Sequence, residues 1–486
     1  MSLSNALSNA VSGLVAASRG TEVVASNLAN ALTPGFARRE MVTSPRPHIS
    51  AGGGVHVDGV VRVVRTSVLS QTRLASAETA RSAALADFHK GMAEALGVPG
   101  QPGTLSTLMA DFDAALVTAA ARADSETNLS RVLLTAQDLG RAFNDIGTKI
   151  QTQRTTADRA IASDIRALND NLVRVSELNR QITVQMASGE DATALQDLRQ
   201  SVIDAIAQIV PVREIPRESG NIALFTTSGT VLLDGSRPPR FEFQEAGPIV
   251  PQMQAGTAAL GFVKIDGVEM AANQMSMLAG GRLEANFMIR DSDAPAAQAR
   301  LDAAARDLYD RFADPELDAT LAAGAAGLFT DGGGAIAAGA DVGLAQRIAV
   351  NSAVDPARGG ALWKLREGLD AAAPGAVGRS DLLEGMRQAL LAGRLPVAPG
   401  ISPVSRTAAA MVADVTSTAS VLRITAETKQ SAAASRGNAF EAMMRQDGVD
   451  SDKEMETLLS LERAYASNAK VLKAVDEMIQ TILRLT

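Results

Sequence analysis

Apolar residues near both ends of the chain recur at alternating steps of four and three residues. This spacing keeps one narrow apolar seam on one side of a helix, and two such helices pair as a coiled coil. Further apolar residues beside the second seam, such as Leu459 and Met478, predict additional partners for the C-terminal helix. A helix packed on the core of its own domain would show a similar seam, so periodicity alone leaves both interpretations open. The predicted interface residues are Leu3, Leu7, Leu14, Val24 and Leu28 in the first helix and Leu458, Leu461, Tyr465, Leu472, Val475, Ile479 and Ile482 in the last.

The first seam runs into a turn. Pro34 lacks an amide hydrogen and disfavours helical backbone for Thr33, so the helix has to end before it. Gly35 permits the positive φ that a sharp exit needs, and Phe36 follows it. Asn30, Pro34, Gly35 and Phe36 complete the set of predicted interface residues.

The longest regular pattern lies between residues 124 and 186. Two apolar seams follow each other there, the second shifted by about one residue, and neither glycine nor proline interrupts residues 148–188. A helix of this length would reach on the order of 90 Å at about 1.5 Å per residue, which suits a rod-like bundle. Asn179, like Asn468 in the last helix, occupies a seam position. We expect each to be a hydrogen-bonded core amide or a residue that fixes register, and not a ligand.

Two segments are expected to form β-structure. β-Branched residues alternate between Val55 and Val64 after a run of glycines, which predicts a small hairpin or ribbon near residues 52–65. Short β-rich segments recur across residues 209–280, and Asp266-Gly267 is a strong signal for a type I′ hairpin. We therefore expect a separate β-rich insert with its own core between helices.

Together these patterns predict a mainly α protein with a β-rich insert. The expected architecture is a long-helix bundle, paired terminal coiled-coil helices and one small β domain. We assign residues 1–45 and 446–486 to the terminal helical, coiled-coil domain, residues 46–208 and 281–445 to the bundle, and residues 209–280 to the insert.

Other features are interpreted as ordinary structure. The Ala/Gly-rich stretch 322–343 is expected to be a loop, because its Asp331-Gly332-Gly333-Gly334 lacks the Lys-Ser/Thr that a P-loop needs. Later helices are expected to open at Asp293 and at a Ser380 cap. The acidic residues of the last helix are interpreted as its solvated face, namely Glu454, Glu456 and Glu462.

The composition narrows the classes of protein. A net charge of -8 argues against nucleic acid or an anionic membrane as a main partner, and no apolar run is long enough to span a bilayer. Absence of cysteine removes disulfides, thiol nucleophiles and thiolate metal sites. His48, His56 and His89 form no HExxH motif, and no GxSxG elbow is present. We therefore expect no enzyme activity, cofactor or metal. No signal peptide is visible, so composition by itself favours a cytosolic protein.

The residues around the turn resemble the N-terminal signature of the bacterial flagellar axial proteins, which form the rod, hook and hook-filament junction. The match runs through Ser26-Asn27-Leu28-Ala29-Asn30 and Thr33-Pro34-Gly35-Phe36-Ala37-Arg38. The last aromatic position of the family is usually Tyr, so a hydrogen bond from a ring hydroxyl does not carry over to Phe36. Near the other end, residues 448–455 resemble the closing motif of the family.

Motifs in the middle of the chain resemble, in order, those of the junction members of this family. They are Leu178-Asn179-Arg180-Gln181-Ile182, Ala194-Leu195-Gln196-Asp197-Leu198-Arg199, Gly280-Gly281-Arg282-Leu283 and Arg290-Asp291. The resemblance implies a structural protein that joins hook to filament through self-assembly of its terminal helices. Its implied partners are the hook protein, a second junction protein on the flagellin side of the filament, and an export chaperone at the C-terminal helix. The implied location is the extracellular flagellum, reached through the flagellar export channel without a cleaved signal peptide.

Several alternatives stay open at this point. Another axial protein, a hook or distal rod subunit, would share the terminal motifs and lack the central ones. An intracellular coiled-coil scaffold would share the seams, and an enzyme in the β insert would need a pocket with convergent polar groups. Ala6, Gly13 and Gly20 recur every seven residues beside the first seam, which suits either close helix approach or flexibility during export.

Overall fold

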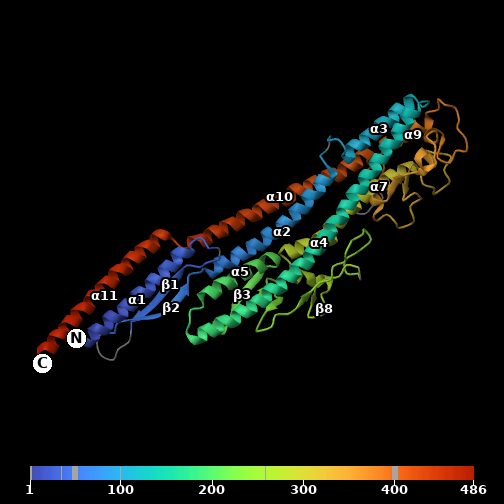
Figure 1. Cartoon of the computed structure of the whole chain (residues 1–486). Helices are drawn as coiled ribbons and strands as arrows, with labels where there is room; N and C mark the ends of the chain where they lie inside the picture. Colours follow the sequence, from blue (N-terminus) through green and yellow to red (C-terminus); the bar gives the residue numbers. More distant parts are fainter. Residues whose placement is uncertain are drawn as a thin grey trace.

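The computed structural model describes residues 3–33, 35–45, 53–98, 100–257, 259–396 and 403–485. The chain forms a long rod of helices with both termini at the same end (Figure 1). Helices α1 (Leu3–Asn30) and α11 (Ser451–Leu485) extend from one end of a helical bundle. The predicted mainly α fold, with long helices and a small β insert, is confirmed. The bundle contains α2 (Thr66–Leu96), α3 (Leu105–Ala121), α4 (Glu126–Ser188), α5 (Thr193–Ile209), α6 (Arg282–Met288), α7 (Ala294–Phe312), α8 (Lys364–Glu367), α9 (Asp381–Leu391) and α10 (Ala408–Gln446).

Helices α2 and α10 run antiparallel along one side of the bundle. Arg65, just before α2, forms an ion pair with Asp447, just after α10. Further along, Gly437 of α10 faces Thr79 of α2, with 3.4 Å between the position of a Cβ on the glycine and the threonine hydroxyl. This pairing returns the chain to the place where it entered the bundle, so α1 and α11 leave from the same end (Figure 1).

Helix α4 is a single helix of 63 residues, about 95 Å long at 1.5 Å per residue. It begins at a Ser125 cap and ends at Gly189, which has the left-handed φ of 75°. We call the end of the bundle near α1 and α11 proximal and the opposite end distal (Figure 1). The first seam, residues 129–150, packs into a distal core with α2, α3, α7, α9 and α10. The second, residues 161–175, packs into a proximal core with α5, α6 and the β insert. The shift of about one residue between the seams therefore marks a change of packing partner. Met186, at the end of the predicted second seam, is exposed.

The β insert consists of two small antiparallel sheets. Asp266 and Gly267 have positive φ values of 50° and 82°, so the predicted type I′ hairpin is confirmed. The sheets are β3-β4-β5 and β6-β7-β8, made of β3 (Val212–Pro216), β4 (Ile222–Thr226), β5 (Val231–Leu233), β6 (Phe241–Glu242), β7 (Lys264–Ile265) and β8 (Val268–Glu269).

The expectation that the insert has its own core is wrong. Leu224, Leu233 and Phe241 of the insert pack in one cluster with Leu168 of α4 and Ile203 of α5. The physical reason is size, because sheets of three strands, each two to five residues long, bury little apolar surface by themselves and gain stability by packing against a helix.

The Arg290-Asp291 pair lies where the two cores meet. The fully buried Arg290 guanidinium bonds to Asp158 at 2.8 Å and to Asp291 at 2.7 Å, and it lies 4.9 Å from the centre of the Phe287 ring. Burial acts to lower the pKa of Arg290, and the bonds to the two carboxylates outweigh it and raise the pKa. Arg154 donates to the carbonyl of Arg290 at 2.9 Å. A charge this deep is tolerated only because its partners compensate it.

The other central motifs also hold α4, α5 and the insert together. A Cβ on Gly281 would lie 2.1 Å from the carbonyl oxygen of Ile209, so no larger residue fits there. Asn179 donates to the carbonyl of Ile222 at 2.9 Å and accepts from Arg199 at 2.8 Å, which confirms a core amide. Burial lowers the pKa of Arg199 to about 10.

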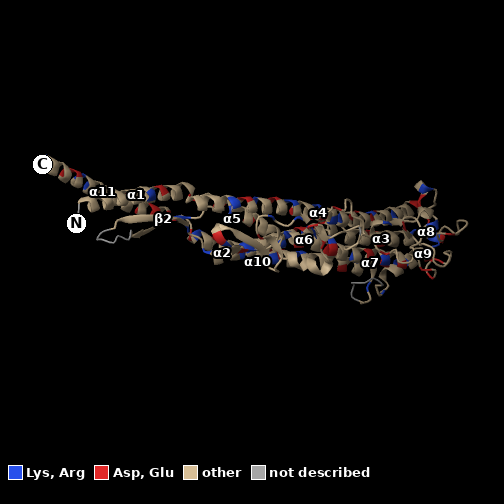
Figure 2. Ribbon diagram, turned by 90° about the horizontal axis from the view of Figure 1, so that it is seen from below, with Lys and Arg blue, Asp and Glu red and all other residues tan. Residues whose placement is uncertain are grey.

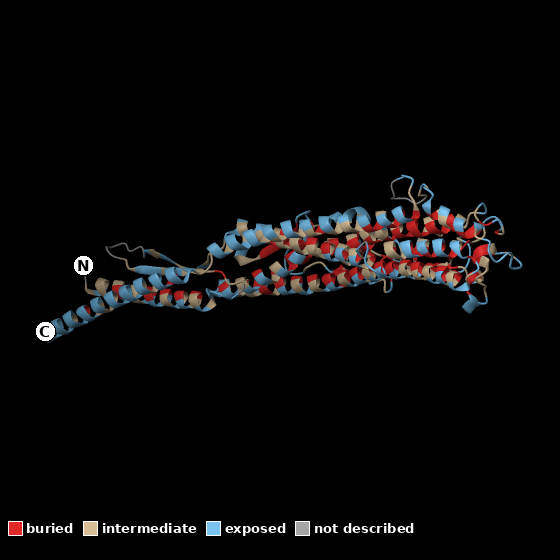
Figure 3. Cartoon of the chain, turned by 90° about the horizontal axis from the view of Figure 1, so that it is seen from above, coloured by how far each residue is buried: buried red, intermediate tan, exposed pale blue. Residues whose placement is uncertain are grey.

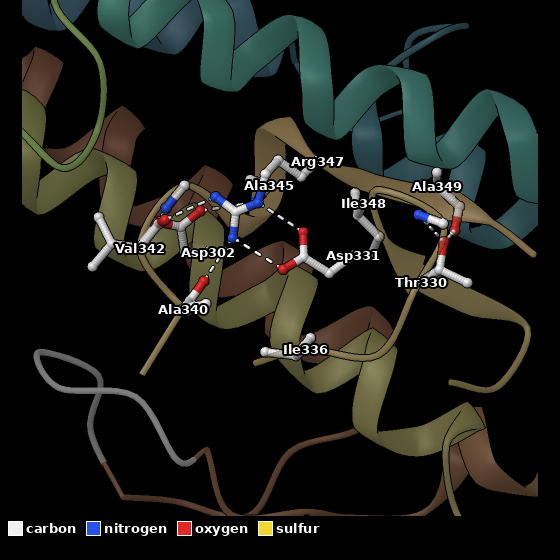
Figure 4. Close-up of polar contacts among 12 residues, drawn as sticks. Asp302, Thr330, Asp331, Ile336, Ala340, Val342, Ala345, Arg347, Ile348 and Ala349 are labelled. Atoms are coloured by element: carbon white, nitrogen blue, oxygen red, sulfur yellow. Dashed lines mark hydrogen bonds and ion pairs between the residues drawn. The ribbon is translucent and has the colours of Figure 1, made fainter. Parts of the chain in front are cut away.

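The Ala/Gly-rich stretch 322–343 is more ordered than expected (Figure 4). It contains β9 (Phe329–Asp331), which pairs with β10 (Ile348–Val350). Asp302 of α7 accepts from the amides of Gly343 at 2.7 Å and Ala345 at 2.8 Å, and burial raises its pKa. Arg347 donates twice to Asp331. A three-residue strand among glycines has too short a pattern to be predicted from sequence.

Three further local expectations are corrected. The ribbon near residues 52–65 is β2 (Val55–Arg62), and its partner β1 (Arg39–Pro45) lies inside the segment assigned to the terminal helical domain. The helix at Asp293 does not begin there, because it continues from α6 through a π-helical turn (Ile289–Asp293). Ser380 precedes α9 without making a capping hydrogen bond.

Removal of the insert tests whether α4 and α5 depend on the core that they share with it. Replacing residues 212–278 by a short Gly/Ser linker should unfold the proximal part of α4 and α5, because their apolar faces would lose cover. We expect a lower helical circular dichroism signal and an earlier thermal transition than in the full chain. Unchanged helicity would show that these helices hold together without the insert.

Removal of the Asp158 carboxylate tests whether its ion pair with Arg290 stabilises the fold where the two cores meet. Asp158→Ala should lower the free energy of unfolding by about 3 kcal/mol, because Arg290 would lose one of its compensating carboxylates. Asp145→Ala, at an exposed position of the same helix, is the control and should change it by less than about 0.5 kcal/mol. Equal effects of the two substitutions in urea unfolding would contradict this role.

Candidate assembly interface

Helices α1 and α11 pack antiparallel in a regular register. Asn27 contacts Glu454, Gly20 faces Leu461, and Gly13 faces Asn468. Each step of seven residues along α1 is thus matched by a step of seven along α11, as expected for coiled-coil packing.

Small residues permit the closest approach of the two helices. A Cβ on Gly13 would lie 2.6 Å from the Asn468 side chain, and one on Gly20 would lie 2.9 Å from Leu461. Val475, the one buried apolar residue among the described side chains of α11, lies one further heptad along and so falls opposite Ala6 in the same register. Of the two interpretations of the Ala6, Gly13 and Gly20 repeat, the structure favours close approach.

The larger residues predicted for the interface are less enclosed. Ala10, Ala17 and Val24 of α1 are buried. Leu7, Leu14 and Leu28 are only half-buried. Each of these leucines follows directly after a residue that faces α11, namely Ala6, Gly13 and Asn27. On α11, Tyr465 and Ile482 are each about half exposed, at 50%. The remaining predicted positions, Leu3, Leu458, Leu461, Leu472 and Ile479, are half-buried.

Asn27 joins the helix pair to the ribbon that follows. Its side chain donates to the carbonyl of Arg39 at 2.9 Å and accepts from the amide of Arg39 at 2.9 Å, so it bonds to the backbone as a neighbouring strand would. It also donates to the Glu454 carboxylate at 3.1 Å. Both side chains are buried. The expectation that Glu454 belongs to the solvated face is therefore wrong, whereas Glu456 and Glu462 are exposed. Asn27 stands in the family motif, which was the only signal for its role.

The turn after α1 has the expected backbone. Gly35 has a φ of 80°, and the Asn30 side chain donates to the carbonyl of Ser26 at 2.9 Å, which ties the end of the helix. The half-buried Phe36 ring lies 5.0 Å from the Arg39 guanidinium. Pro34 lies outside the described residues.

Asp197 anchors the turn and the ribbon to the bundle. Its carboxylate pairs with Arg62 at 2.7 Å and Arg39 at 3.4 Å, and it accepts from the amide of Ala37 at 3.3 Å. Asp197 belongs to α5 and to one of the central motifs. The anchor therefore connects the terminal and central motifs physically, which sequence spacing did not show.

Much of α11 remains uncovered (Figure 3). Its exposed large apolar side chains are Met455, Leu459, Tyr465, Val471, Met478, Ile482 and Leu483. Val11 and Val15 are exposed on α1. Exposed apolar side chains gathered on one element are typical of an interaction surface.

The chemistry of the described residues is otherwise plain. They contain no group of three or more histidines or carboxylates placed to hold a metal, and none of their helices is both long and apolar enough to cross a bilayer. His56 is exposed on β2, His89 lies 3.6 Å from Asp293, and His48 lies outside the described residues. Acidic and basic residues are interspersed along the rod (Figure 2).

Three family models match successive parts of the chain. Residues 7–36 match the flagella basal body rod protein family. Residues 96–327 match the helical domain of flagellar hook-associated protein FlgK. Residues 441–485 match the C-terminal domain of the flagellar basal body rod FlgEFG proteins.

Individual relatives agree with these matches. Flagellar hook-associated protein 1 of Escherichia coli (strain K12) is 24% identical over 241 residues, which cover 48% of this chain and 44% of that protein. Flagellar hook-associated protein 1 of Salmonella typhimurium (strain LT2) is 24% identical over 242 residues, which cover 48% of this chain and 43% of that protein. This chain is thus matched over less than half the length of these relatives.

Among solved structures, the flagellar hook junction protein FlgK of Burkholderia pseudomallei aligns with a TM-score of 0.42 at 18% identity, over 54% of this chain and 47% of that one. Family signatures of the axial proteins thus occupy both ends of the chain, and that of the hook-associated proteins occupies its middle. The chain is therefore similar to the hook-associated proteins of the bacterial flagellum.

Proposed function

We propose that this protein is a structural subunit that joins the flagellar hook to the filament, and that it does so by self-assembly of α1 and α11. The observation that carries the proposal is the helix pair that extends from the bundle with much of α11 exposed (Figure 3) and with several large apolar side chains left uncovered. Neighbouring copies would supply the missing cover. The terminal domain, at residues 1–45 and 446–486, would form the tube, and the bundle and insert would lie outside it.

The proposed partners follow from this place in the flagellum. They are further copies of the chain, the hook protein on one side, and a second junction protein on the flagellin side. An export chaperone at α11 would cover the same apolar side chains before assembly. The protein would be extracellular, exported through the flagellar channel, and would have neither enzyme activity nor a nucleic-acid or membrane partner.

A hook or distal rod subunit is the second candidate, because both terminal matches are to rod-protein families. The match of residues 96–327 to the hook-associated helical domain favours the junction. Immunogold labelling of intact cells separates the candidates. Label at the hook-filament boundary supports the junction, label along the hook or at its base supports the second candidate, and label absent from the cell surface supports an intracellular scaffold.

Close helix approach should be sensitive to side-chain size at Gly20. Gly20→Leu should force α1 and α11 apart and destabilise their pairing by roughly 1–3 kcal/mol. Ser18→Leu, at an exposed position of the same helix, is the control and should leave the pairing intact. Thermal melting followed by circular dichroism tests this, and equal melting curves for the two variants would contradict the close contact.

A charge in the α11 seam should block assembly. Leu472→Asp would place a carboxylate where the assembled tube closes, and an unpaired buried charge is strongly unfavourable. We expect the variant to be exported, while cells lacking a junction shed unpolymerised flagellin into the medium. Leu472→Met preserves the apolar character and should support normal filaments. Normal filaments on cells that carry only Leu472→Asp would exclude an essential role for this seam.

A further inference from the structure

Leu32 is held out into solvent by an ordered turn. Its side chain is 97% exposed, the highest value among the exposed large apolar side chains of the described residues. The turn is held in place by two contacts to Asn30: the Thr33 amide donates to its carbonyl at 2.9 Å, and the Thr33 hydroxyl lies 3.3 Å from its side chain. Burial of this side chain by a partner would be favourable, because it removes apolar surface from water.

A pocket lies beside this turn, at the neck between the terminal helices and the bundle. Its volume is about 730 Å³, within the range of about 300–1,000 Å³ that is common for binding pockets. The start of α2, one side of α5 and the end of α10 line it. Its apolar lining includes Val63, Val64, Leu69, Met444 and Val449. We call it the neck pocket.

The charges of the neck pocket suit the turn. Helix α1 has no basic residue in its last turn, so the partial negative charge at its C-terminal end lacks a cation of its own there. Four arginines and three carboxylates line the neck pocket, namely Arg38, Arg65, Arg73, Arg445, Asp204, Glu441 and Asp447. Arg65 and Arg445 each pair with one carboxylate, which leaves other N–H groups of each guanidinium able to donate to backbone carbonyls.

The turn and the neck pocket lie at the same height along the rod, because Ala31, Leu32 and Thr33 are themselves among the residues that line the pocket of their own copy. Copies packed side by side and parallel would therefore place the turn of one copy at the level of the neck pocket of the next. Such a contact joins two different surfaces of the same chain, so it repeats from copy to copy around a ring or along a helix.

We propose that Ala31, Leu32 and Thr33 of one copy dock in the neck pocket of the adjacent copy. This inference rests on the proposed function, since it requires copies of the chain to assemble side by side. Leu32 contacts the apolar lining, and the carbonyls at the end of α1 accept hydrogen bonds from the arginines. The neck contact thereby sets the rotation between neighbours, in addition to any packing among the terminal helices.

Cross-linking between separate chains tests the contact directly, because the chain contains no cysteine. Cells would produce one copy with Leu32→Cys and a second with Leu69→Cys, and flagella isolated from them would be treated with a short bismaleimide. A dimer band that joins the two chains is expected. Leu32→Cys combined with Val421→Cys, exposed on α10 away from the neck pocket, is the matched control and should give none. No dimer from the first pair, or equal dimer from both, would overturn the proposal.

Substitution of Leu32 gives an independent measurement. Leu32→Asp should leave the melting temperature of the monomer unchanged, because the residue is already in solvent, while cells lose filaments and shed flagellin. Leu32→Met should keep the filaments. Normal filaments on cells that carry Leu32→Asp would overturn neck docking. If cells that carry Leu472→Asp lose their filaments in the same experiment, the proposed function would still be supported. Normal filaments with both would overturn the proposed function too.

Discussion

The antiparallel return of α10 along α2 is the constraint on which the rest of this structure depends. The two helices carry the chain to the distal end of the bundle and back, so the segments before α2 and after α10 meet, and Arg65 pairs with Asp447 at that point. Only because both ends leave from this place can residues hundreds of positions apart in sequence form a helix pair (Figure 1). The regular register between α1 and α11 follows from it.

The helix pair is closed through small and polar residues, and this has a consequence for the larger ones. Gly13 and Gly20 allow the backbones to come close, and Asn27 with Glu454 ends the contact with buried hydrogen bonds. Leucines such as Leu7 and Leu14 are then only half-buried, and several large apolar side chains of α11 remain exposed. The two helices therefore leave apolar side chains in solvent, which supports the proposal that neighbouring copies cover them.

Rigidity of the bundle comes from the way α4 connects two cores. Arg290, Asp158 and Arg154 lie where the cores meet and hold α4 against the turn between α6 and α7. Asp197 of α5 then ties the neighbouring proximal core to the ribbon and the turn after α1. The central motifs thus act mechanically, since they fix the direction in which the terminal helices leave the bundle.

The sequence by itself determined the long helices, the seams and the type I′ hairpin, because these depend on local spacing and on φ preferences. The shift between the two seams of α4 was also visible, although its meaning as a change of core was not. Tertiary structure alone decided which small residues form the α1–α11 contact, that Glu454 is buried, and that the β insert shares its core with α4 and α5. These features depend on residues brought together from distant segments, such as Asn27 with Glu454 and Phe241 with Leu168. Local periodicity contains no information on such pairs, because burial is set by whatever packs against a residue and not by the residue alone.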